Sequence, residues 1–175
     1  MIIPLSNLKE LYPNENEQSL IDKILAIESA IRGYTNNNFQ DTRVRFTVDI
    51  KNNKCFPSSN YIKAGDTITI SQSINEGFYN VECVTDEHIA ISEELIDSPV
   101  NLLTKVKYPH DVISVAMDLL KWTIEYSNKQ AMGITEESIS RYTVKYANTN
   151  SEETNVNGFP ISIMNRLKPY MKAKF

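Results

Sequence analysis

Hydrophobic residues in the first part of the chain follow a helical spacing. Between positions 16 and 36 they recur every three or four residues, which places them on one face of a helix. The residues of this stripe are Leu20, Ile24, Ile27, Ile31 and Tyr34. A shorter helix is predicted over residues 7–12, with Ser6 as its N-cap and Pro13 as its end. The chain therefore opens with two predicted helices.

The period changes to two from about residue 42, as is typical of β-strands. Residues 43–50 alternate polar and apolar side chains, and Asn52-Asn53 provides a tight turn before another short strand at 54–56. Further strands are predicted at 67–71, 78–84 and 88–92, each bounded by turn residues. About five short strands at regular spacing predict a small closed barrel, which loosely resembles an SH3-type barrel.

Helical spacing returns after Pro109, over residues 110–131, and Gly133 ends this helix. Residues 140–147 alternate again and predict a strand. A polar stretch at 147–157 follows, and Pro160 then starts a terminal helix. We therefore expect an α+β fold: a small α-helical bundle with an inserted small β-barrel or β-sheet module, and a C-terminal strand plus helix. The helical domain is expected over 1–41 and 108–175, and the inserted module over 42–107.

Composition is that of an ordinary soluble protein. The 175 residues are 41% hydrophobic and 23% charged, with a formal net charge of −4. A negative charge argues against nonspecific binding to nucleic acid, because affinity for phosphates comes from clustered Lys and Arg. No apolar run approaches the roughly 18 residues that span a bilayer, and residues 1–6 lack the pattern of a signal peptide. We expect a protein that is not associated with membranes, with Cys55 and Cys83 as two buried thiols rather than a disulfide.

Residue patterns that carry chemistry are scarce. The five glycines are too dispersed for a phosphate-binding loop. His88 and His110 have no Cys or carboxylate at metal-ligand spacing, and adjacent carboxylates such as Asp86-Glu87 point apart. We expect no enzyme activity, no metal site and no cofactor.

The alternating face of the predicted strand at 140–147 has two interpretations. Tyr142, Val144 and Tyr146 form either a core face or an interface face, because tyrosine is enriched in interfaces. A strand beside helices must pair with something, and a neighbouring subunit is a natural partner.

Several segments, in their order along the chain, resemble the head–tail connector proteins of tailed bacteriophages, also called head-completion or adaptor proteins, of the siphophage type. The resemblance covers residues 5–40 and 108–172. The matching segments are Leu5-Ser-Asn-Leu-Lys-Glu-Leu11, the helix end from Ile31 to Phe39, Tyr108-Pro109, Glu137-Ser-Ile-Ser-Arg-Tyr-Thr-Val-Lys-Tyr146, and Gly158-Phe-Pro160 leading to Leu167 and Tyr170. The module at 42–107 departs from the family, where many relatives have a short connection, so its role is not carried over.

The resemblance implies a structural virion protein at the head–tail interface. Such a protein forms a homo-oligomeric ring, here expected to be a dodecamer, beneath the portal protein. The ring extends the DNA channel and provides the platform for a stopper or tail-completion protein. DNA passes through without specific binding, and the β module is a candidate contact with capsid protein. Docking to the portal or to a neighbouring subunit is expected at Arg141, Tyr142, Val144, Tyr146, Phe159, Pro160, Ile163, Met164, Leu167, Tyr170 and Met171.

A second hypothesis is a small binding module for nucleic acid or another ligand, built on the barrel. Single strands bind to barrels through exposed aromatic side chains combined with Lys and Arg. The predicted barrel contains both kinds: Phe46, Phe56, Tyr61, Phe78 and Tyr79 are interspersed with Arg43, Arg45, Lys51, Lys54 and Lys63. The same residues serve equally well as the core and rim of a barrel.

Overall fold

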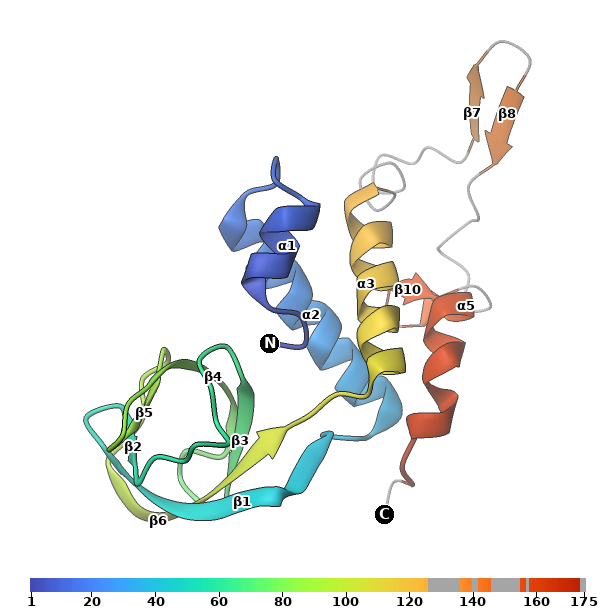
Figure 1. The fold of residues 1–175 in the computed structure, drawn as a ribbon. Coiled ribbons are helices and arrows are strands. Elements are labelled where there is room, and N and C mark those ends of the chain that lie inside the picture. Colours follow the sequence, from blue (N-terminus) through green and yellow to red (C-terminus); the bar gives the residue numbers. More distant parts are fainter. Residues whose placement is uncertain (126–135, 140–141, 146–154, 157, 174–175) are drawn as a thin grey trace. The chain divides into compact units, whose positions relative to one another are not determined.

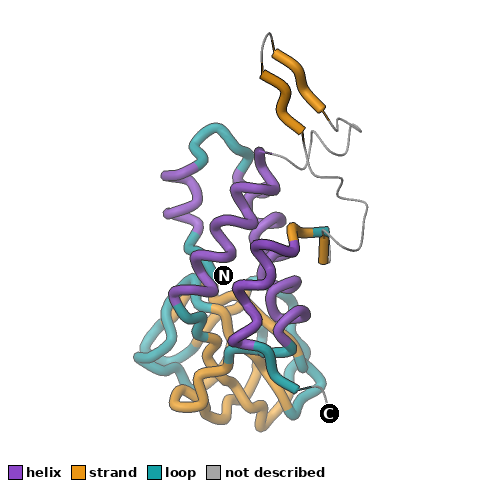
Figure 2. The backbone as a smooth tube through the Cα atoms, turned by 90° about the vertical axis from the view of Figure 1, so that its right-hand side faces the viewer, coloured by secondary structure: helices purple, strands orange, loops and turns teal. Residues whose placement is uncertain are grey.

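The structure is a computed structural model that describes residues 1–125, 136–139, 142–145, 155–156 and 158–173 (Figures 1 and 2). The chain divides into two compact units, which are described separately. The first contains Met1–Pro13 and Asn38–Tyr108, and the second contains Asn14–Asn37 and Pro109–Phe175.

The first unit is built around a closed antiparallel barrel of six strands (Figure 1). Its strands follow the spatial order β1-β2-β5-β4-β3-β6, and β6 closes the barrel by pairing with both β1 and β3. A short helix, α1, precedes the barrel in the chain. The bounds are α1 Leu5–Leu11, β1 Gln40–Lys51, β2 Lys54–Phe56, β3 Thr67–Ser71, β4 Gly77–Val84, β5 Ile89–Ile91 and β6 Ser98–Val106.

The inward faces of these strands form one apolar core. Each strand contributes one or two side chains to it, which alternate as expected from the period of two, and Ile62 and Leu95 join from the loops. Figure 2 shows the strands, in orange, wrapping around this interior. The core residues are Val48, Ile50, Cys55, Ile62, Ile68, Ile70, Val81, Ile89, Ile91, Leu95 and Leu103.

The turn between β1 and β2 confirms a prediction from the sequence. Asn52 and Asn53 have φ angles of 50° and 60°, and Lys51 lies opposite Lys54. Two consecutive residues with positive φ match the right-handed twist of the strands, and asparagine tolerates this conformation better than most residues.

The sixth strand was not predicted, because two of its four buried residues are polar. Asn101 and Thr104 are fully buried, whereas the neighbouring Leu102 is only half-buried. Pro99 also reads as a break in a strand. The alternation of apolar and polar residues that identifies a half-buried strand is therefore missing from β6.

The predicted fold class, a small helical bundle with a small inserted module, is wrong. The structure is a closed six-stranded antiparallel barrel with four short α-helices among the described residues. Two features account for the difference: the added strand β6, and the N-terminal segment. Met1–Pro13 groups with the barrel, where the terminal amino group of Met1 donates to Gly65 O at 3.0 Å and to Asn80 Oδ1 at 2.9 Å.

Ser6 is not the cap of α1. The helix begins at Leu5, with Pro4 preceding it, and no side chain caps its first turn. Ser6 lies inside the helix, and its hydroxyl donates to the side chain of Asn7.

The second unit is formed by α2, α3 and the C-terminal segment, which pack on one another. Asn16 caps α2 by accepting a hydrogen bond from Ser19 N at 3.1 Å, and Asn36 ends it with a φ of 47°. The predicted long helix is confirmed as α3 up to Glu125, and the rest of the range lies outside the described residues. The bounds are α2 Glu17–Thr35, α3 His110–Glu125, β7 Glu136–Ile139, β8 Tyr142–Lys145, β9 Asn155–Val156, β10 Phe159–Pro160, α5 Ile161–Met164 and the 3₁₀ helix η1 Asn165–Tyr170.

The predicted terminal helix is one α-helical turn continued by a 3₁₀ helix. Pro169 lacks a backbone N–H and disfavours the α conformation of the residue before it, so the tighter 3₁₀ winding replaces a longer α-helix. Met171 already has an extended backbone, with φ −68° and ψ 135°.

One end of the barrel is held together by a buried network of two asparagine side chains. Asn101 Nδ2 donates to Val48 O at 3.1 Å and to Ser98 O at 2.9 Å, while its Oδ1 accepts from the Ser98 and Ser73 hydroxyls. Asn75 is 6% exposed and exchanges two 2.8 Å hydrogen bonds with the backbone of Ile96. The loop after β3 and the loop before β6 are thereby joined to β1.

Replacing Asn101 with alanine removes both donors to buried carbonyls and leaves a small void. We expect Asn101→Ala to lower the free energy of unfolding by about 2–4 kcal/mol. Thr42→Ala, at an exposed position of β1, should change it by less than about 0.5 kcal/mol. Urea unfolding of the full chain measures both; equal stability of the two variants would contradict the structural role of the network.

Candidate functional site

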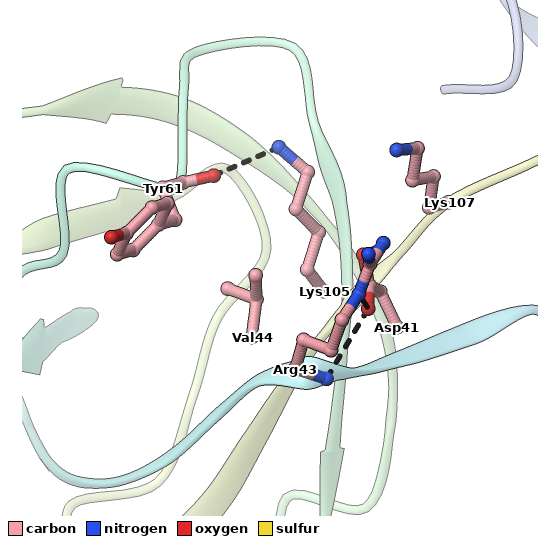
Figure 3. A pocket seen from close by; sticks show the side chains of 6 residues that line it. All are labelled: Asp41, Arg43, Val44, Tyr61, Lys105 and Lys107. Atoms are coloured by element: carbon pink, nitrogen blue, oxygen red, sulfur yellow. Dashed lines mark hydrogen bonds and ion pairs between the residues drawn. The ribbon is translucent and has the colours of Figure 1, made fainter.

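The barrel carries a pocket of about 520 Å³ where β1 begins and β6 ends (Figure 3). Four of its six lining side chains are charged, and three of those are cations. The other two, Val44 and Tyr61, provide apolar surface, and Tyr61 is 72% exposed. The lining residues are Asp41, Arg43, Val44, Tyr61, Lys105 and Lys107.

Arg43 curls over Asp41, as Figure 3 shows. Its Nε and Nη2 lie 2.9 Å and 3.0 Å from the two carboxylate oxygens, a bidentate ion pair. The hydrogen bonds from Arg43 lower the pKa of Asp41 to about 2. Asp41 therefore stays ionised throughout the physiological range, and the pair keeps the Arg43 side chain in place.

Lys105 ties the segment before β3 to β6. Its Nζ lies 2.5 Å from Asp66 Oδ2 and donates to Tyr61 O at 2.9 Å, as drawn in Figure 3. The exposed Lys107 lies on the same side of the chain two residues later. The pocket thus combines three cations and one carboxylate with the apolar side chains of Val44 and Tyr61, which suits a negatively charged group that carries an apolar part.

The sequence singled out Arg43 and Tyr61 among the aromatic and basic residues of the barrel, but missed Lys105 and Lys107. These two lysines belong to β6 and its end, which was not recognised as a strand. Had β6 been recognised, the i, i+2 spacing would have placed both lysines on one face.

The residues predicted to dock onto partners belong either to the predicted strand at 140–147 or to the C-terminal segment. Arg141 and Tyr146 lie outside the described residues. Tyr142 and Val144 lie on β8, which pairs with β7: Tyr142 is opposite Ile139, and Val144 is opposite Glu137. The predicted strand is therefore one arm of a hairpin.

The predicted docking residues of the C-terminal segment pack within their own unit. Met164 and Leu167 are fully buried. The ring of Phe159 lies edge-on to that of Trp122, with centroids 6.1 Å apart, and Tyr170 donates a 3.0 Å hydrogen bond to Asp111. Pro160 and Ile163 are half-buried, whereas Met171 is 50% exposed.

Polar contacts hold the same segment to α2 and α3. Arg166 forms an ion pair with Asp118 and donates to Ser114 Oγ at 3.2 Å. Asn37 Nδ2 donates to Tyr170 O at 3.0 Å, and Lys172 N donates to Thr35 O at 2.8 Å. Both side-chain and backbone groups therefore fix this segment to the two helices.

In the described part of the chain, no group of three or more His, Cys, Asp or Glu side chains is arranged to hold a metal ion. His88 accepts or donates a 3.0 Å hydrogen bond with Thr85 and packs on Phe56, and His110 is exposed at the start of α3.

The expectation of two buried thiols is wrong for one of them. Both cysteines are free, but Cys83 is exposed. Burial raises the pKa of Cys55 to about 11, so this thiol is unreactive at neutral pH.

Of the helices that the structure describes, none is long and apolar enough to cross a bilayer.

Comparison with protein-family models gives no match, and comparison with curated protein sequences gives none either.

Titration of Asp41 tests the geometry of the pocket. A carboxyl whose folded pKa is depressed contributes stability above its ordinary pKa of 3.8, and that contribution is lost as the pH falls through about 2. We expect an NMR midpoint near 2 for the Asp41 carboxyl, and a shift back towards 3.8 in Arg43→Gln. Lys107→Gln should move the midpoint less, because Lys107 acts only through its charge. An unshifted midpoint in Arg43→Gln would rule out the ion pair.

Burial of Leu167 is expected to stabilise the second unit. Leu167→Ala should lower the free energy of unfolding by about 2–4 kcal/mol and increase amide exchange in η1 and in the parts of α2 and α3 that it contacts. Met171→Ala, at a half-exposed neighbour, should change stability by less than about 0.5 kcal/mol. Unchanged exchange in Leu167→Ala would show that the segment does not pack as described.

Proposed function

We propose that this protein is a structural subunit of a tailed-phage head–tail connector. In this proposal it forms a homo-oligomeric ring beneath the portal protein, extends the DNA channel and provides the platform onto which the tail side joins. The observation that carries the proposal is the β7–β8 hairpin. In the described part of the chain its two strands pair only with each other.

A two-stranded hairpin is marginally stable in water on its own. The outer edge of each strand presents backbone N–H and C=O groups that accept a further strand. The hairpin is also connected to well-packed elements on both sides, since α3 precedes it and α5 with η1 follows it. An element that is weak alone and open at its edges is suited to pairing with a partner subunit.

The C-terminal segment that follows the hairpin in the chain is packed within its own unit. Met164 and Leu167 are buried within their own unit, and Arg166 and Tyr170 bond to α3. The chain that returns from the hairpin is therefore fixed where it rejoins the helices. Among the C-terminal residues expected to dock, the more accessible ones, such as Met171, are the ones left to contact a partner.

The sequence provides the second line of support. The segments that resemble head–tail connectors include the strand β8 and the start of α5, and they occur in the family's order. A net charge of −4 is compatible with a channel wall that lets DNA pass without gripping its phosphates. The proposal accordingly places the protein in the virion, with the portal protein on one side, a stopper or tail-completion protein on the other, and capsid protein as a candidate contact of the barrel.

One observation favours a second function, a binding module for single-stranded nucleic acid. The pocket combines an exposed tyrosine ring with Arg43, Lys105 and Lys107. Two of these cations already have carboxylate partners, which weakens their attraction for a phosphate. Fluorescence anisotropy with a labelled single-stranded oligonucleotide at moderate salt separates the two functions, because a connector subunit should show no saturable binding.

A hairpin replacement in the phage that encodes the chain tests the connector proposal. With residues 136–145 replaced by a Gly-Ser linker of equal length, we expect particle assembly to stop at DNA-filled heads and separate tails, as seen by electron microscopy. The wild-type chain supplied from a plasmid should restore complete particles. Circular dichroism should show that the purified variant keeps its barrel and helices. Complete infectious particles made with the variant chain alone would contradict the proposal.

A further inference from the structure

Three exposed apolar residues lie at the end of the barrel opposite the pocket: Ile74 and Ile96 in the loops before β4 and β6, and Val100 near the start of β6. Ile74, Ile96 and Val100 are 72%, 59% and 68% exposed, and they make up half of the large exposed hydrophobic residues in the described part of the chain. We call Ile74, Ile96 and Val100 the apolar tip. A cluster of this kind on a rigid support is typical of an interaction surface.

The tip is rigid because the asparagine network lies directly beneath it. Asn75 follows Ile74 and bonds to the backbone of Ile96, and Asn101 follows Val100 and bonds to Ser73 and Ser98. The network therefore joins the two loops that carry Ile74 and Ile96 to the start of β6, which carries Val100. A partner that binds here therefore does not have to order these loops, and little conformational entropy is lost in them on binding.

Val100 also has an unusual backbone conformation. Its φ is +54°, which a β-branched residue rarely adopts, and Asp49 Oδ1 accepts its backbone N–H at 3.1 Å. Neither burial nor packing explains a valine here, since the side chain is largely exposed. A strained, exposed apolar residue points to a function at that position.

The surroundings of the tip are acidic. The same end of the barrel carries the carboxylates of Asp49, Glu76, Glu93, Glu94 and Asp97 and the ammonium groups of Lys51 and Lys54. Five negative and two positive charges leave a net charge of −3. Two copies of this end would repel each other.

The pocket lies at the other end of the same pair of strands. Asp41 is opposite Lys105 in the β1–β6 ladder, whereas Ile50 is opposite Ser98 near the tip. At about 3.3 Å per residue, the two ends are roughly 20–25 Å apart. The pocket combines the apolar side chains of Val44 and Tyr61 with a lining charge of +2, reduced to +1 by Asp66.

We propose that the apolar tip of one copy docks into the cationic pocket of a second copy. The two surfaces complement each other in both apolar character and charge, and they lie on different faces of the barrel, so the contact is head-to-tail. Repeated head-to-tail contacts close into a ring or continue as an open chain. This inference rests on the proposed function, which requires a ring, and it names the surfaces through which neighbouring copies meet.

Sedimentation velocity of the full chain over a concentration series, at low and moderate salt, tests the contact. We expect concentration-dependent association that weakens with salt. Val100→Asp and Lys107→Glu should each weaken it at least about tenfold. Val100→Gly should weaken association while leaving thermal stability equal or higher, because glycine adopts positive φ without strain. Leu11→Asp, at a 53% exposed apolar position of α1, is the matched control and should leave association unchanged.

A mixing experiment tests the direction of the contact. Lys107→Glu and the double variant Glu93→Lys/Glu94→Lys should each associate poorly alone and recover association when mixed, because the reversed tip then meets the reversed pocket. The inference is overturned if the wild-type chain stays monomeric, or if the tip variants act while Lys107→Glu does not, which indicates a tip-to-tip contact. It is also overturned if none of these substitutions changes the strength of association. The particle assay of the hairpin variant is independent of these outcomes, so a failed barrel contact and a failed connector function remain distinguishable.

Discussion

Closure of the barrel by β6 is the constraint on which the rest of the first unit depends. This strand pairs with β1 along one edge and with β3 along the other, although it buries Asn101 and Thr104 where apolar residues would be expected. A buried amide is tolerated only when its hydrogen bonds are made. Asn101 makes them with Val48, Ser73 and Ser98, and in doing so it fixes the loops around it. Lys105 lies near the end of the same strand and Lys107 follows it, so this strand connects Val100 of the tip to two cations of the pocket.

The two units differ in whether their strands leave unpaired edges. The barrel leaves no free edge, because all six strands are paired on both sides. The hairpin β7–β8 is the contrasting case, since its pairing stops after two strands in the described part of the chain. In the proposed connector, this open pairing belongs to the element that meets other proteins, while the barrel contacts a neighbour through side chains alone.

Elements with a strong period could be predicted from the sequence, and those held by polar contacts could not. The stripe from Leu20 to Ile31 predicted α2, and the Asn52-Asn53 turn predicted the first hairpin of the barrel. β6 escaped prediction because two of its four buried residues, Asn101 and Thr104, are polar and are satisfied by hydrogen bonds. The error propagated to the site: without β6, neither the fold class nor the lysines of the pocket could be recognised. Docking at Met164 and Leu167 was expected from the resemblance, but both side chains are buried within their own unit, which explains their apolar character without a partner.

The order of the two units along the chain has a consequence for synthesis on the ribosome. All strands of the barrel have been made once Val106 emerges, so the barrel can close early. The helix α2 is made before the barrel, yet its partners α3 and η1 are made after it. The apolar face of α2, including Leu20 and Ile24, therefore lacks its native contacts during synthesis of the barrel. The barrel lies in the chain between the two segments that make up the helical unit. Nascent chains stalled after Tyr108 should be the species that chaperones recognise.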